Sequence, residues 1–216
     1  MQFVCAIFSN DVNISIKVGF GDGLGLALDG ATGKSASTYD LDEGYSYYQL
    51  HQALVDHGVS DQMLPPVDPT DGQNFIVPKV QARALGLFST PPSSGFDGSA
   101  IFSSAAIFDY STVGQVDAGK ISFVGVVEHE LSEIMGRVGV GPSSSNYNAT
   151  ILSLYRYSGA GVLALGTAAD SYFSTDRGVT LMASFNNPYS SSGGDFGDWA
   201  SSAGRDVFWP TLSMGQ

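Results

Sequence analysis

Apolar and polar residues alternate through residues 12–21, VNISIKVGFG. A period of two places every second side chain on the same face of a strand, so this segment predicts a strand with one buried face. Two later segments predict helices. One ends at Gly58, and the other spans residues 77–88 with Pro78 in its first turn.

The third and clearest predicted helix runs at least from Val124 to Met135. The glycine-rich residues 21–37 predict a loop with an edge strand in its middle. After Gly139, short apolar runs separated by turn residues predict loops and short strands. These patterns predict one α+β domain over residues 1–216, with a twisted sheet, an approach helix, a helix just past the middle of the chain and an irregular C-terminal half.

The charge of the chain narrows its partners. It has 21 acidic against 9 basic residues and a net charge of −12. Phosphate groups would be repelled rather than neutralised, which argues against nucleic acid or an anionic membrane as partner. No window has the roughly 20 apolar residues that a membrane span needs.

Features of export are mixed. Cys5 is the sole cysteine, so it cannot form an internal disulfide, and we expect it to be buried. The first residues, MQFVCAIF, lack the basic start and the long apolar core of a signal peptide. Few lysines beside many Gly, Ser, Tyr and Asp residues are common in secreted bacterial proteins, so we expect an exported protein whose signal has been removed.

The segment VVEHELSEIMGR, residues 126–137, carries the candidate chemistry. On a helix, His129 and Glu133 lie four residues apart on one face, where both can bind one cation. Zinc accepts imidazole nitrogen and carboxylate oxygen at roughly 2.0–2.2 Å. Glu130 is rotated by about 100°, so its carboxylate can act as general base on a water molecule without binding the metal.

The ordinary alternative for this segment is an exposed acidic helix face. Apolar residues flank the motif on both sides, however, and ionisable groups in an apolar helix are costly unless they are paired or coordinate an ion. The sequence therefore favours a metal site. Because Glu133 stands where metalloproteases carry a second histidine, its negative charge predicts a weaker Lewis acid, and hence slower hydrolysis or a more alkaline pH optimum.

VEHELSEIMGR also resembles the signature of a family of bacterial secreted zinc metalloproteases, often sorted to the cell envelope, with the motif His-Glu-x-x-Glu-x-x-Gly-Arg. Ser153 and Arg177 depart from that family, where Asp and Gly are expected. The family is also expected to continue past Gln216, which implies a trimmed C-terminus. The resemblance implies a metzincin-like fold and a zinc site. It extends in order over VNISIKVGFG, LPPVDPTDGQNFIVPKVQARALGL, LYRYS, YFSTDRGVTLMASFN and GGDFGDWAS.

The third metal ligand is not part of the motif. Metzincin-type zinc proteases continue with x-x-Gly-x-x-His, and Gly136 fits that glycine. The ligand position, however, is occupied by Gly139, so the third ligand must come from elsewhere. Candidates in the C-terminal loops are Asp176, Asp195 and Asp198.

We take Asp195 as the third ligand, because its neighbouring glycines allow tight turns that would direct a carboxylate inward. These aspartates equally suit Asx-turns or a Ca²⁺ site. His51 and His57 are less favoured, and His57 at a helix end is expected to interact with the helix dipole.

Other polar residues have ordinary interpretations. Arg137 is expected to pair with a carboxylate or to steady an acidic ligand. Tyr155 and Tyr157 alternate as in a strand, and packing is expected rather than a role in polarising an oxyanion.

The sequence leads to a secreted or cell-envelope zinc metallopeptidase that acts on a protein or peptide substrate. His129, Glu133 and Asp195 would bind Zn²⁺, and Glu130 would be the general base. The alternative is a non-catalytic extracellular acidic domain with a structural Zn²⁺ or Ca²⁺, or with a surface-binding role. A hydrolase acting on a non-peptide substrate is a third possibility, because water activation is not specific to peptides.

Overall fold

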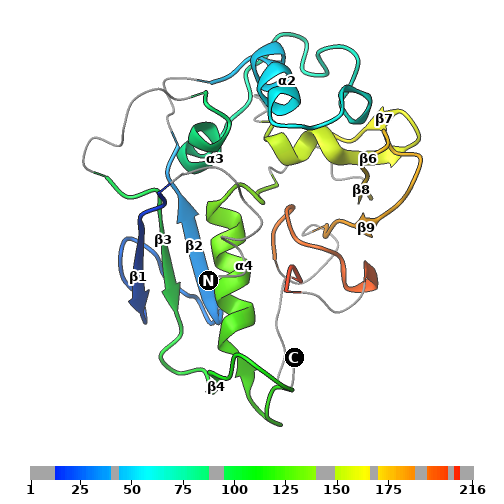
Figure 1. The fold of residues 1–216 in the computed structure, drawn as a ribbon. Coiled ribbons are helices and arrows are strands. Elements are labelled where there is room, and N and C mark those ends of the chain that lie inside the picture. The colour runs from blue at the N-terminus through cyan, green and yellow to red at the C-terminus, as the bar shows by residue number, and fades with distance from the viewer. Residues whose placement is uncertain are drawn as a thin grey trace.

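The computed structural model has a mixed α+β architecture in which a long helix, α4 (Phe123–Ile134), lies between a small sheet and an irregular C-terminal half (Figure 1). Cys5 and Val12 lie outside the described residues. The structure describes residues 13–39, 44–87, 95–139, 149–165, 170–187, 194–203 and 207–209.

The N-terminal sheet has three strands: β1 (Ile16–Phe20), β2 (Gly33–Ser37) and β3 (Gly98–Phe102). Their order is β1-β3-β2, with β1 parallel and β2 antiparallel to β3. The strand predicted within residues 12–21 is confirmed as β1. The edge strand predicted in the middle of residues 21–37 lies instead at the end of that segment, as β2. The alternation in residues 12–21 places Val18 on the face that is predicted to be buried. This part of the prediction is wrong, because Val18 is 59% exposed in β1, which lies at the edge of the sheet.

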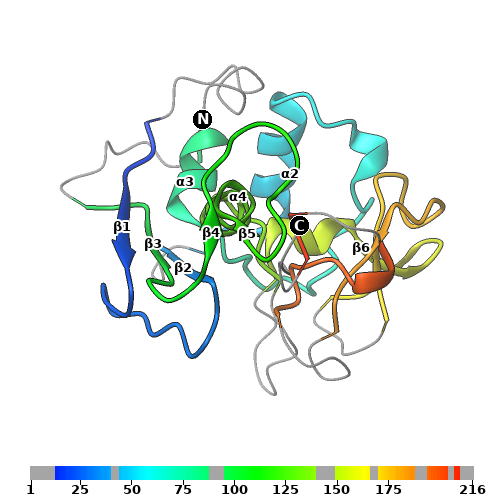
Figure 2. The ribbon, with the colours of Figure 1, turned by 90° about the horizontal axis from the view of Figure 1, so that it is seen from below.

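Helix α4 packs against this sheet, as the view along the helix shows (Figure 2). Ser122 caps its N-terminus by accepting a hydrogen bond from the Gly125 N–H at 3.0 Å. The close packing depends on Gly98 of β3, where a Cβ atom would come within 2.7 Å of the Ile134 side chain. The core here comprises Ala100, Phe102, Phe108, Val126 and Ile134.

Two further helices cover the top of the molecule in Figure 1, α2 (Tyr47–Asp56) and α3 (Lys79–Ala84). The predicted helix that ends at Gly58 is confirmed, and Gly58 has the left-handed φ of 91° that suits a helix end. The predicted helix over residues 77–88 is shorter in the structure, with Pro78 as its N-cap. A second core forms around these helices from Tyr45, Tyr47, Leu50, Leu54, Leu64, Phe75, Val77, Ala82, Ala149, Ile151 and Leu154.

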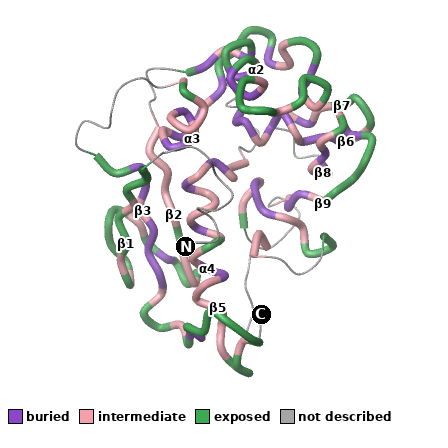
Figure 3. Tube along the Cα trace, in the orientation of Figure 1, coloured by how far each residue is buried: buried purple, intermediate pink, exposed green. Residues whose placement is uncertain are grey.

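The C-terminal half is irregular, as predicted, and its buried segments alternate with exposed turns (Figure 3). Its sheet has four strands: β6 (Arg156–Gly159), β7 (Val162–Leu163), β8 (Tyr172–Phe173) and β9 (Ala183–Ser184). Their order is β7-β6-β8-β9, with antiparallel neighbours. Within the described ranges, no helix combines the length and the apolar character needed to cross a bilayer. The remaining elements are β4 (Phe108–Asp109), β5 (Ile121–Ser122) and the 3₁₀ turns Asp61–Met63, Ile151–Tyr155 and Ser201–Ala203.

Candidate metal centre

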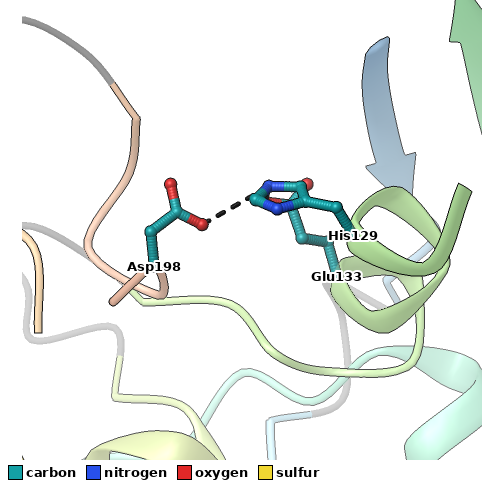
Figure 4. Close-up of side chains that lie close together, drawn as sticks. All are labelled: His129, Glu133 and Asp198. Carbon is teal, nitrogen blue, oxygen red and sulfur yellow. Dashed lines mark ion pairs between the residues drawn. The ribbon is translucent and has the colours of Figure 1, made fainter. Parts of the chain in front are cut away.

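Three side chains that can bind a metal converge between α4 and the C-terminal half: His129, Glu133 and Asp198 (Figure 4). His129 Nε2 lies 3.2 Å from Glu133 Oε1 and 3.4 Å from Asp198 Oδ1. One ligand atom from each residue lies within 4.8 Å of the other two. Helix α4 therefore presents the imidazole and the carboxylate together, as the four-residue spacing predicts, and the third group crosses over from the C-terminal loops.

The C-terminus of α4 turns the chain back over the site. Gly136 has φ 114°, and its N–H donates to the Glu133 carbonyl at 2.9 Å. The Arg137 N–H donates to the Ser132 carbonyl, also at 2.9 Å, which completes a Schellman motif. Gly136 is thus a helix-ending glycine, as the motif predicts. The turn lets the Arg137 side chain reach back to Ser132, where Nε donates to Oγ at 2.7 Å.

Two glycines bring the loop that carries Asp198 against this turn. A Cβ atom on Gly139 would clash with the backbone of Phe196 and Gly197. A Cβ atom on Gly197 would lie 2.7 Å from the Arg137 carbonyl oxygen. These contacts are tighter than a side chain permits, so both positions require glycine for steric reasons.

The orientation of His129 is fixed from its far side. Nδ1 lies 2.7 Å from the carbonyl oxygen of Val207, which can only accept, so Nδ1 carries the proton of this hydrogen bond. In the neutral imidazole, the Nε2 lone pair then faces the two carboxylates. Metal-binding histidines commonly have such a partner on the other nitrogen, because it selects the tautomer and aims the ring.

The donor set fits a zinc ion. The Nε2 lone pair of a neutral His129 and the oxygens of Glu133 and Asp198 repel one another. A cation between them, either a proton or a metal ion, removes this repulsion. Bonds of about 2.0–2.1 Å in a tetrahedral site place neighbouring ligand atoms about 3.3 Å apart. The separations of 3.2 and 3.4 Å around Nε2 match that spacing. One imidazole and two carboxylates are also ligand types that zinc accepts.

The protonation states of His129 and Glu133 depend on each other. Burial acts to lower the pKa of His129, but the hydrogen bond to Glu133 and the charges of Asp198 and Glu133 outweigh it and raise the pKa. Burial acts to raise the pKa of Glu133, but hydrogen bonds from His129 and Ser35 outweigh it and lower the pKa. The Ser35 hydroxyl of β2 donates to Glu133 Oε2 at 2.7 Å, so the sheet also holds this ligand.

Glu130 lies between α4 and β2, next to the candidate ligands. It is buried, and a Cβ atom on Gly33 would come within 2.7 Å of its Oε1 atom. Burial, followed by the charge of Glu133, raises the pKa of Glu130 to about 7, against weaker opposing effects of His129 and Ser35. A carboxylate with such a pKa suits proton transfer near neutral pH.

The predicted third ligand, Asp195, is not part of the group that the structure brings together. Its Oδ1 atom accepts from the Gly197 N–H at 2.6 Å, and its own N–H donates to Asp198 Oδ2 at 2.9 Å. Burial, with the charges of Asp198 and Glu133, raises its pKa to about 8. The geometry therefore favours Asp198, which the sequence left open, and gives Asp195 the role of shaping the loop.

The other candidate ligands have partners of their own. Asp176 accepts from the Thr180 N–H at 2.8 Å in a local turn. His51 pairs with Asp61 at 2.9 Å, and His57 Nδ1 contacts the Ala53 carbonyl of its own helix at 2.8 Å. Within the described residues, none of these side chains lies in a metal-binding group with His129.

Sequence reasoning missed several residues around the site. Ser35 and the Val207 carbonyl both contact ligands directly, yet no motif marks either of them. Tyr39 is close enough that the charges of Glu133 and Asp195 add to burial in raising its pKa. Tyr155 packs against Phe173 with ring centroids 5.8 Å apart, which is the packing role expected of it.

Comparison with known proteins adds no assignment. No protein-family model, no curated protein and no solved structure matches this chain. The family resemblance of the motif therefore stays a prediction. A function has to be argued from the chemistry of the site itself.

Proposed function

We propose that the protein is a zinc-dependent metallopeptidase of the metzincin-like type that the motif resembles, secreted or sorted to the cell envelope. His129, Glu133 and Asp198 would be its metal ligands. The observation that carries the proposal is the position of His129 Nε2, 3.2 and 3.4 Å from two carboxylate oxygens while Nδ1 is held by the Val207 carbonyl. A net charge of −12 suits a protein or peptide substrate better than a polyanion.

A zinc ion bound to these residues would supply Lewis acidity and lower the pKa of a water molecule. Glu130 would accept the proton on its carboxylate and deliver it to the leaving amine. Burial raises the pKa of Glu130 in the metal-free protein, which favours a carboxylate that can take up a proton and release it again. Ser35 would keep Glu133 in place through its hydrogen bond.

A second candidate function is a non-catalytic domain, in which the cluster is structural. The favouring observation is Arg137, which lies 2.8 Å from Asp198 Oδ1 and 3.5 Å from Glu133 Oε1. Together with a protonated His129, this guanidinium neutralises both carboxylates without a metal. A structural metal at the same group would give the same surface domain without turnover.

The Glu130→Gln variant separates these functions. Protein prepared without chelators is analysed for bound metal, and hydrolysis of a generic unfolded protein is followed. We expect one zinc per chain in both forms and a loss of at least about 100-fold in turnover in the variant, because general-base catalysis contributes that much. Unchanged hydrolysis would refute the role of Glu130, and wild-type protein without metal would refute the zinc site.

A further inference from the structure

The guanidinium of Arg137 contacts residues of the candidate site that come from different segments of the chain. Arg137 Nε donates to Ser132 Oγ at 2.7 Å, on the last turns of α4. Its Nη1 donates to Asp198 Oδ1 at 2.8 Å and to the Gly197 carbonyl at 2.9 Å, both in the C-terminal loop. Its Nη2 lies 3.5 Å from Glu133 Oε1. A planar guanidinium can make this set of contacts, whereas an ammonium cannot span it.

Phe208 covers the face of this guanidinium. The ring centroid lies 4.8 Å from Arg137 Cζ, within the range of a cation–π contact. The Phe208 carbonyl accepts a hydrogen bond at 2.8 Å from the N–H of Trp199, the residue that follows Asp198. The neighbouring Val207 carbonyl accepts a hydrogen bond from His129. Segment 207–209 therefore contacts His129, Arg137 and the loop of Asp198 at once.

We propose that Arg137 and Phe208 are positioning residues that hold Glu133 and Asp198 in ligating geometry and so set the metal affinity of the site. This inference rests on the proposed zinc site. Two carboxylates a few ångströms apart repel each other and would separate in the metal-free protein. Arg137 offsets that repulsion because its guanidinium pairs with both carboxylates, at 3.5 Å from Glu133 Oε1 and 2.8 Å from Asp198 Oδ1. Partners that orient metal ligands in this way typically change metal affinity by roughly 10–100-fold when they are removed.

The chain offers a matched control. Arg83 pairs with Asp97 at 2.6 Å, and their side chains are 11% and 5% exposed, against 9% and 2% for Arg137 and Asp198. Asp97 also accepts from the Ser15 N–H at 2.7 Å, so this pair ties segments together without touching the candidate ligands. Arg83→Met therefore removes an equally buried ion pair away from the site.

The test measures the dissociation constant of Zn²⁺ by competition with a chromophoric chelator, together with thermal unfolding of the metal-free and zinc-loaded protein. We expect Arg137→Met to weaken zinc binding by roughly 10–100-fold. Arg137→Lys should recover part of that loss, because it restores the charge but not the fork. Phe208→Leu should weaken binding several-fold, and Arg83→Met should lower thermal stability while keeping the wild-type dissociation constant.

Each other outcome overturns the inference. If Arg137→Met binds zinc as tightly as wild type or more tightly, Arg137 does not position the ligands and the zinc site itself stands. If Arg83→Met weakens binding equally, the effect is general destabilisation. If wild type binds no zinc, the proposed function falls together with the inference. Should Arg137→Met not fold, Arg137→Lys and Phe208→Leu carry the same prediction.

Discussion

Gly139 and Gly197 meet backbone to backbone, so closely that a Cβ atom on Gly139 would clash with Phe196 and Gly197, and one on Gly197 would lie 2.8 Å from the Gly139 nitrogen. Gly139 occupies the position that carries the third histidine in the metzincin motif, beyond the helix-ending glycine. Here the absent side chain makes room for the loop that delivers Asp198. If Asp198 is the third ligand, as proposed, the absence of a side chain at Gly139 and the approach of Asp198 to His129 have one structural cause.

Replacing Gly139 with alanine should separate the loop from the end of the helix. The added methyl group would meet backbone, which cannot rotate away as a side chain can. We expect a loss of about 1–3 kcal/mol in unfolding free energy, typical of overpacking. Zinc affinity should fall as well, because Asp198 moves with the loop. Denaturant unfolding and zinc titration measure the two effects.

Gly23→Ala is the control, since nothing lies within 4 Å of a Cβ atom there. It should change the unfolding free energy by no more than about 0.5 kcal/mol. If Gly139→Ala binds zinc as tightly as wild type, the contact between Gly139 and Gly197 does not position Asp198 for metal binding.

Asp198 and Asp195 offer a direct choice between two candidate ligands three residues apart. Asp198→Asn should weaken zinc binding by more than about 100-fold, beyond the loss that a supporting residue causes. Asp195→Asn keeps an oxygen that can accept from the Gly197 N–H and should weaken it by less than about 10-fold. Isothermal titration of both variants decides the matter, and the reverse ranking would restore Asp195 as the ligand.

Much of the site could be predicted from local sequence. The pair His129 and Glu133 follows from helical spacing alone, and the helix end follows from Gly136. These contacts span five residues or fewer, where the backbone period sets the geometry.

The rest depends on contacts between distant segments. Asp198 and Asp195 each follow a glycine in the sequence. Contacts between distant segments distinguish them: the docking of Gly197 on Gly139 and the contacts of Asp198 with His129 and Arg137. The Val207 carbonyl carries no side-chain signal at all. The exposure of Val18 likewise follows from the strand order of the sheet, which the alternating pattern does not encode.

Glu133→His tests whether the anionic ligand weakens the Lewis acid. A neutral imidazole should neutralise less of the metal's positive charge than a carboxylate does, so the pKa of the metal-bound water should fall. The pH optimum should then move to lower pH by roughly one unit. The variant has to be shown to hold zinc, because Ser35 and Arg137 lose their acceptor. The pH dependence of kcat/KM provides the measurement, and an unchanged profile would contradict the predicted effect of charge.

Asp195 predicts how the stability of the metal-free protein depends on pH. Its pKa is raised to about 8 in the fold, against about 3.9 in the unfolded chain. Between these values the folded state keeps a proton that the unfolded state has released, so the stabilisation present below pH 4 is lost as the pH rises through 8.

Asp195→Asn removes this loss. In the presence of a chelator, the Tm of Asp195→Asn should match that of wild type near pH 4 and exceed it at pH 8.5. Each kcal/mol of difference in unfolding free energy should shift the Tm by roughly 2–4 °C. Glu130 contributes in the same direction in both proteins, so the difference between the two melting curves isolates Asp195. Parallel curves across this range would mean that Asp195 is ionised in the folded protein.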